Sequence, residues 1–190
     1  MKNNSQKRQR KSIRLNEYDY SFPNWYYITI CTYKKRNLFG KINNGKMILN
    51  KFGNVVKEEW MRTKEIRKYV DLDYYVIMPN HLHGIIIIEQ SIGNGGGELN
   101  SPVKNESGRI RYAPTNNKFK SPSHSLGAIV RGFKSSVTKR LREFSGNSNL
   151  KIWQRNYYEH IIRNELDLQN IRKYISLNPI KWEIDEYFNS

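Results

Sequence analysis

The stretch DLDYYVIMPNHLHGIIIIE, residues 71–89, decides the fold. Its first part, Asp71 to Ile77, is rich in aromatic and β-branched residues and predicts a strand. Met78-Pro79-Asn80 predicts a turn, because proline has no N–H to donate to a sheet. His83 to Glu89 contains four consecutive isoleucines, which predict a second strand buried on both faces. Tight turns of this kind favour an antiparallel sheet.

The segments around this pair interleave strand and helix patterns. Asn50 and Asn164 each precede helical spacing and are predicted N-caps, and Pro179 is expected to end the last helix. The predicted elements are a strand at 26–32, a hairpin around Asn43-Asn44-Gly45, helices at 50–67, 125–144 and 164–178, and short β-like pieces at 150–153 and 157–162. This order predicts an α+β fold, a ferredoxin-like sandwich with a mainly antiparallel central sheet and helices packed on one face.

The length of 190 residues fits one domain with attached polar segments. Residues 1–20 are polar and basic and are expected to form a flexible arm ahead of a domain at 21–190. Residues 90–123 combine glycines, prolines, serines and asparagines, and predict a long flexible insertion. No segment has the roughly 18 consecutive apolar residues of a membrane span, and no signal sequence is evident, so we expect a cytoplasmic protein.

The charge favours a nucleic acid as partner. Lys and Arg total 33 against 17 acidic residues, which gives a net charge of +16. Such an excess attracts polyanions, and 13 Tyr, 4 Trp and 7 Phe offer flat surfaces on which unpaired bases can stack. An anionic membrane surface is the weaker alternative.

His81-Leu82-His83 is the first candidate site. Residues i and i+2 of a strand face the same way, so both imidazoles can reach one metal ion, whose open positions would accept water or phosphate oxygens. Two structural histidines, or a zinc site, are the alternatives, although zinc usually needs further Cys or His ligands nearby.

Tyr174 is the candidate nucleophile. Tyr174 and Asn178 are spaced i, i+4 and share one face of the last predicted helix. From spacing alone, a half-buried rim tyrosine and an asparagine that merely ends the helix are the favoured explanation of these residues. The segment Tyr157-Tyr158-Glu159-His160 is a rival site, better suited to packing, base stacking or a supporting hydrogen bond.

Together these motifs resemble a known family. Residues 75–84, YVIMPNHLHG, are similar to the histidine-bearing strand of the HUH tyrosine transposases. Residues 153–164, WQRNYYEHIIRN, followed by YISLNP at 174–179, resemble the REP-associated branch of that family. The similarity covers about Tyr20 to Glu186.

The resemblance implies a metal-dependent enzyme that cleaves and rejoins single-stranded DNA folded as a hairpin. It implies Mg²⁺ or Mn²⁺ held by His81, His83 and Asn178, although several family members have Gln at the last position. It also implies that Tyr174 attacks a phosphodiester, leaving a 5′-phosphotyrosine and a free 3′-hydroxyl, with no nucleotide cofactor. The protein would then be bacterial and DNA-associated, and a monomer or a homodimer.

Basic side chains are expected to hold the DNA phosphates. Most lie on the polar face of the 125–144 helix or in the REP-like motifs: Arg131, Lys134, Lys139, Arg140, Arg155, Arg163 and Lys173. Two other functions stay open. One is a protein that binds nucleic-acid hairpins without cleaving them, and the other is a replication or mobilisation initiator that nicks DNA with the same site.

Overall fold

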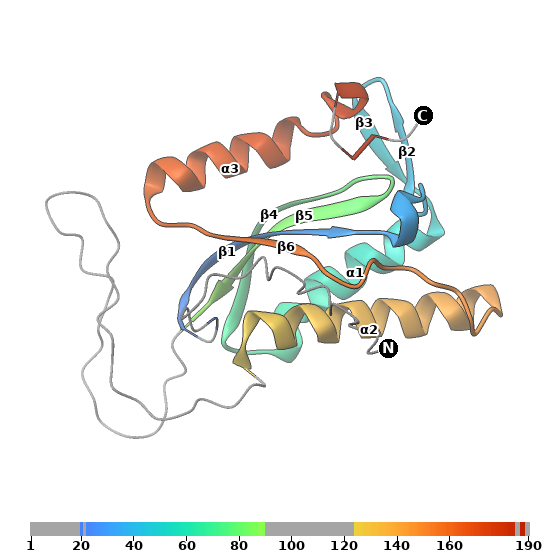
Figure 1. Ribbon diagram of the computed structural model, residues 1–190, viewed down its shortest axis with the longest axis horizontal. Helices are drawn as coiled ribbons and strands as arrows, with labels where there is room; N and C mark the ends of the chain where they lie inside the picture. The colour runs from blue at the N-terminus through green and yellow to red at the C-terminus, as the bar shows by residue number, and fades with distance from the viewer. Residues whose placement is uncertain (1–19, 21, 90–123, 185–186, 189–190) are drawn as a thin grey trace, which may run out of the picture.

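The computed structural model describes residue 20 and residues 22–89, 124–184 and 187–188. The insertion predicted at 90–123 and nearly all of the arm predicted at 1–20 lie outside these residues. Within the described part, the strands and helices form one layered unit around a central sheet (Figure 1).

The central sheet has four strands in the order β4-β5-β1-β6, and every neighbouring pair is antiparallel. The strands are β1 (Asn24–Cys31), β4 (Val70–Ile77), β5 (His81–Ile88) and β6 (Tyr158–Ile161). The turn at 78–80 is closed by a hydrogen bond of 2.8 Å from the Met78 N–H to the His81 carbonyl. β5 begins at His81, so His81-Leu82-His83 opens a strand directly after the turn, as predicted.

Two helices cover one face of this sheet: α1 (Lys51–Ile66) and α2 (Leu126–Ser145) (Figure 1). They start where the sequence predicts, since the side chains of Asn50 and Ser125 accept from the N–H groups of Gly53 and Ala128. α1 connects β1 to β4, and α2 leads into β6, so the sheet and these two helices have the ferredoxin-like order. The predicted fold class is confirmed.

A small hairpin precedes α1. It pairs β2 (Gly40–Asn43) with β3 (Lys46–Leu49), as the Asn-Asn-Gly signal predicts. Asn44 and Gly45 have φ values of 49° and 70°, the left-handed backbone that asparagine and glycine tolerate best.

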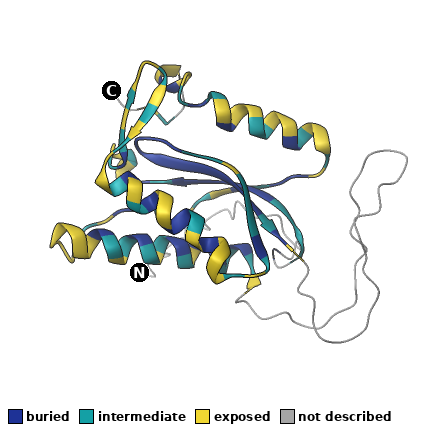
Figure 2. Cartoon of the chain, turned by 180° about the vertical axis from the view of Figure 1, so that it is seen from behind, coloured by how far each residue is buried: buried dark blue, intermediate teal, exposed yellow. Residues whose placement is uncertain are grey.

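The main core lies between the sheet and the two helices α1 and α2. Trp60 of α1 is fully buried there and meets the Phe133 ring of α2 with the centroids 5.4 Å apart. Gly84 of β5 lies directly beneath the Trp60 ring, where a Cβ atom would overlap the indole. The central strands are the most buried part of the molecule (Figure 2).

The third long helix, α3 (Glu165–Leu177), packs on the opposite face of the sheet (Figure 1). The prediction of helices on one face is wrong for this helix. Its apolar residues Leu168 and Ile175 pack with Tyr27 and Ile85, which point away from the main core. The isoleucine run gives β5 two apolar faces, so each face needs a helix to cover it.

Among the described residues, no helix combines the length and the apolar character needed to cross a lipid bilayer.

Candidate functional site

The side chain of Asn80 fixes the protonation of His81. The Asn80 amide nitrogen donates to the carbonyl of Lys35 at 3.1 Å and to that of Tyr187 at 2.7 Å. Its amide oxygen lies 2.8 Å from His81 Nδ1 and can only accept, so Nδ1 carries the proton. The Nε2 atom of His81 then holds the lone pair, and it is buried without a hydrogen-bond partner within the part of the chain that the structure describes.

His83 is held by two hydroxyl groups of β1. Its Nδ1 atom lies 2.8 Å from both the Tyr27 hydroxyl and the Thr29 hydroxyl. Thr29 faces His83 in the antiparallel register of β1 and β5, which explains the contact. This arrangement directs the Nε2 atom of His83 toward α3, where it lies 3.5 Å from the Tyr174 hydroxyl.

Burial keeps both imidazoles uncharged at neutral pH. Each side chain is fully buried. Burial lowers the pKa of His81 to about 3, with a smaller opposing effect of the Asn178 side chain and a further lowering by Lys35. The pKa of His83 is also well below its ordinary value, because of burial first and of His81 second. Neutral imidazoles offer lone pairs, which is the state that binds a metal ion.

α3 presents one tyrosine to solvent and one asparagine to the histidines. Tyr174 is 42% exposed, whereas Asn178, one turn later, is only 2% exposed. The Tyr174 ring lies 5.2 Å from the His83 ring, between centroids. An ion pair of 2.7 Å between Arg172 and Asp73 of β4 ties this helix to the sheet. Tyr174, Asn178 and both histidines therefore converge as the sequence predicts, although they are about ninety residues apart.

These residues fit a divalent metal ion with an open coordination sphere. The two imidazole rings lie 4.4 Å apart, and the unpartnered Nε2 atom of His81 is the kind of buried donor that a cation would satisfy. Among the described residues, no group of three or more His, Cys, Asp or Glu side chains is placed so that it could hold a metal ion. His81, His83 and the amide oxygen of Asn178 would be the protein ligands, and the remaining positions would go to water or phosphate.

Several neighbours of the site were not predicted. The Tyr187 ring lies 4.7 Å from the His81 ring, and Lys35 Nζ lies 5.0 Å from the centroid of Tyr187. Lys34 and Lys35 both adopt left-handed backbone angles, with φ of 58° and 51°. The basic residues that follow β1, Lys34 to Arg36, are visible in the sequence and could have indicated this turn. The roles of Tyr27, Thr29 and Asn80 depend on strand pairing, which no local pattern gives.

A pocket of about 440 Å³ lies beside Tyr174 and Asn178. The exposed side chains of Lys173, which was predicted, and Lys181, which was not, line it. Arg172, which precedes Lys173 on α3, is instead paired with Asp73. Two lysines thus remain to attract an anion to the tyrosine.

The other predicted DNA contacts divide into two groups. Arg140 is bound to Glu58 and Glu59 of α1 at 2.6 and 2.9 Å, and Lys134 Nζ donates to the carbonyls of Gln154 and Arg155. Both side chains already have partners inside the protein, because α1 and residues 150–155 pack against α2. Four others are exposed: Arg131, Lys139, Arg155 and Arg163.

The rival segment supports the site from its edge. The Tyr158 ring meets the Tyr27 ring edge-on at 6.1 Å, and His160 bonds to Asp167 in the first turn of α3 at 2.8 Å. Both contacts help to place Tyr27 and α3. Within the described residues, no hydrogen bond joins the Tyr158 hydroxyl to either histidine, whereas the Tyr174 hydroxyl lies 3.5 Å from His83 Nε2.

A solved structure of a REP-associated tyrosine transposase bound to a REP hairpin is similar over 89% of this chain and 73% of that chain, with a TM-score of 0.56 and 16% identity. A Haemophilus influenzae protein named "Putative REP-associated tyrosine transposase" is 40% identical over 53 residues, 26% of this chain and 30% of that protein. The fold is thus that of the REP-associated tyrosine transposases, and the predicted resemblance is confirmed.

The chain belongs to the same family as a second Haemophilus influenzae protein, an uncharacterized one. The two are 45% identical over 181 residues, which cover 94% of this chain and 93% of the relative. No family model matches the sequence.

Proposed function

We propose that this protein is a transposase-type nuclease that cleaves and rejoins single-stranded DNA, with Tyr174 as its nucleophile. The observation that carries the proposal is the distance of 3.5 Å between the Tyr174 hydroxyl and His83 Nε2. It joins an exposed phenol, which a DNA strand can reach, to a buried pair of neutral imidazoles. The Arg172–Asp73 ion pair keeps the phenol in this position.

In the proposed reaction, the Tyr174 oxygen attacks the phosphorus of a phosphodiester. The bond from phosphorus to the 3′-oxygen breaks, the phenol loses its proton, and the 3′-oxygen leaves as a hydroxyl after gaining one. The DNA then carries a 5′-phosphate bound to Tyr174, and attack by a 3′-hydroxyl reverses these steps and rejoins a strand. One bond is exchanged for another of similar energy, so no nucleotide cofactor is needed.

A phenol is a weak nucleophile because its ordinary pKa is near 10. Mg²⁺ or Mn²⁺ bound by His81, His83 and Asn178 would polarise the phosphate oxygens. Asn80 contributes by holding the His81 tautomer that exposes Nε2, and Tyr27 and Thr29 contribute by orienting His83. Lys173 and Lys181 line the adjoining pocket and would attract the phosphate group.

The proposed substrate is DNA with a hairpin near the cleaved bond. The structural relative with a TM-score of 0.56 is bound to a REP hairpin, and the +16 charge of this chain suits a polyanion. Arg131, Lys139, Arg155 and Arg163 are exposed and remain proposed phosphate contacts, whereas Lys134 and Arg140 are less suited because they have partners within the protein.

The test is the covalent adduct. Labelled single-stranded hairpin DNA is incubated with the protein and Mg²⁺ or Mn²⁺, and a denaturing gel separates free DNA from protein-bound DNA. Tyr174→Phe is expected to lower adduct formation by at least about 10³-fold, since the nucleophile is removed. The matched control is Tyr158→Phe, because Tyr158 has a similar exposure of 45% and is expected to keep the adduct.

His81→Ala is expected to remove the adduct while hairpin binding persists. If wild-type protein forms no adduct with either metal, or if the Tyr174→Phe variant forms one, the assignment is wrong. Binding of the hairpin without any adduct would favour a binding-only protein.

A further inference from the structure

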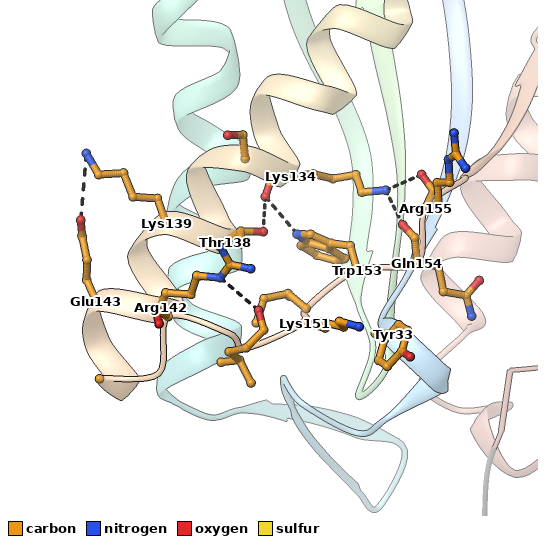
Figure 3. Close-up of a pocket in the computed structure, with 15 residues that line it drawn as sticks. Tyr33, Lys134, Thr138, Lys139, Arg142, Glu143, Lys151, Trp153, Gln154 and Arg155 are labelled. Carbon is orange, nitrogen blue, oxygen red and sulfur yellow. Dashed lines mark hydrogen bonds and ion pairs between the residues drawn. The ribbon is translucent and has the colours of Figure 1, made fainter.

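A groove of about 970 Å³ runs between α2 and the segment that follows it (Figure 3). α2 ends at Gly146, which has a φ of 64°, and the chain then turns back along the helix. Fifteen residues line the groove, of which five are basic and only Glu143 is acidic. This charge balance selects for an anionic occupant.

The walls of the groove are held together by hydrogen bonds within the protein. The Trp153 indole donates to the Lys134 carbonyl at 3.2 Å, and Lys134 Nζ donates to the carbonyls of Gln154 and Arg155. Near the other end, Arg142 donates to the Leu150 carbonyl at 3.1 Å. These contacts, drawn in Figure 3, join α2 to residues 150–155 through the backbone of one side and a side chain of the other, and they preform the groove.

Other basic side chains of the groove do not hold its walls together. Lys151 and Arg155 are exposed, and neither side chain forms an ion pair with a described carboxylate. Lys139 forms a long ion pair of 4.0 Å with Glu143. Both side chains are exposed to solvent, so water and salt weaken the pair. Basic side chains that are not used inside the protein are available to phosphate groups.

An aromatic ring surrounded by cations closes one end of the groove. Lys151 Nζ lies 5.3 Å from the centroid of the Tyr33 ring, Lys34 Nζ lies 5.8 Å away, and the Arg36 guanidinium carbon 5.9 Å away. Unpaired bases stack on such rings while neighbouring cations hold their phosphates. A base inside a paired stem has no free face for this contact, so the ring favours an unpaired strand.

The Tyr33 end of the groove adjoins the histidine site. The Tyr33 N–H donates to the Ile152 carbonyl at 2.7 Å, and the preceding residue, Thr32, donates to the Asn80 carbonyl at 2.8 Å. Asn80 in turn holds His81. Two backbone hydrogen bonds therefore link the Tyr33 end of the groove to the turn that carries Asn80 and His81.

We infer that this groove binds unpaired DNA that flanks the cleaved bond, with Lys151 and Arg155 on its phosphates and Tyr33 stacked on a base. This inference rests on the proposed function for the identity of the DNA. The groove lies beyond the cleavage site itself and includes neither the histidines nor Tyr174.

The test is binding without cleavage, in EDTA, followed by fluorescence anisotropy over a range of salt concentrations. The probe is a hairpin carrying an unpaired thymidine flank, compared with the same hairpin without the flank. The Lys151→Ala, Arg155→Ala double variant is expected to bind the flanked probe about tenfold more weakly at 0.1 M salt. The slope of log K against log salt should become shallower by about 1.4, as for two lost contacts to a single strand.

Lys57→Ala, Lys68→Ala is the matched control, because both lysines are exposed and lie outside the groove. Tyr33→Leu should weaken the flanked probe about 5- to 100-fold without changing the salt slope, and Tyr33→Trp should restore binding. Near-ultraviolet circular dichroism would show that each variant is folded.

Equal losses in the groove variant and the control would overturn the inference. So would equal losses for the probes with and without the flank, because the groove would then hold the stem. Neither result depends on adduct formation, so failure of the groove and failure of the proposed cleavage are distinguishable.

Discussion

The two faces of the central sheet differ in how much they bury and in what they carry. Counting only the residues that the structure describes, the face under α1 and α2 belongs to a core of twenty buried residues, whereas the face under α3 belongs to a cluster of five. The difference follows from the alternation of side chains along a strand. On β5, Leu82 and Ile86 point into the large core, while His81 and His83 point to the other face.

A single sheet can therefore separate stability from chemistry. The large core supplies most of the buried apolar surface, which is the dominant stabilising contribution. Because the large core stabilises the fold, the α3 face can carry histidines, a threonine and a tyrosine, even though apolar residues at these positions would stabilise the protein more. This division predicts that substitutions in the large core change the free energy of unfolding most, and that substitutions on the α3 face change it less.

Trp60→Ala should destabilise the protein by about 3–5 kcal/mol, because it removes the largest fully buried side chain of the main core. Leu168→Ala on the α3 face should destabilise the protein by only about 2 kcal/mol. Leu168 belongs to the smaller cluster of buried residues, whose side chains can move into the cavity that the substitution leaves. Urea unfolding of both variants measures the two values. Equal costs would show that the two faces contribute alike and would remove the basis of the comparison.

Acid should destabilise the metal-free protein through the α3 face. Burial holds the pKa of His81 near 3, below its ordinary value of 6.5, so the unfolded chain binds a proton more readily than the folded one. The stabilisation is complete above about pH 6.5 and decreases as the pH falls toward 3. Between pH 7 and pH 5 the loss due to His81 is about 2 kcal/mol.

Urea unfolding in EDTA at pH 7 and pH 5 tests this prediction. His81→Gln should remove about 2 kcal/mol of the difference between the two pH values, whereas Trp60→Ala should leave the difference unchanged. A difference that is the same in the His81→Gln variant and in wild type would assign the acid sensitivity to other groups.

Thr29→Val should affect metal binding with little effect on folding. The change keeps the side-chain shape but removes one of the two hydroxyls that contact His83 Nδ1. Because the Tyr27 hydroxyl remains, Mn²⁺ affinity should fall by about tenfold, the lower end for residues that support metal ligands. Calorimetric titration with Mn²⁺ measures it. Ser135→Ala, an exposed position on α2, is the control, and equal affinities in the two variants would contradict the supporting role.

Most of the secondary structure was predictable because it depends on local signals. The asparagine caps of α1 and α3, the Asn-Asn-Gly hairpin and the isoleucine-rich strand all lie where the sequence places them. The segment at 150–153, predicted as a short β-like or irregular piece, forms a single bridge between Thr32 and Trp153, because residues 150–155 are held mainly by α2 side chains. Long-range contacts of this kind leave no periodic pattern.

Local patterns were enough to predict the fold class, the direction of both histidines and the shared face of Tyr174 and Asn178, because periods of 2 and 3.6 residues set which side chains point together. Three features follow instead from tertiary packing: α3 covers the second face, Asn80 sets the His81 tautomer, and Arg140 is already paired with Glu58 and Glu59. These contacts join residues far apart in the chain, so they depend on how the elements pack and not on local spacing.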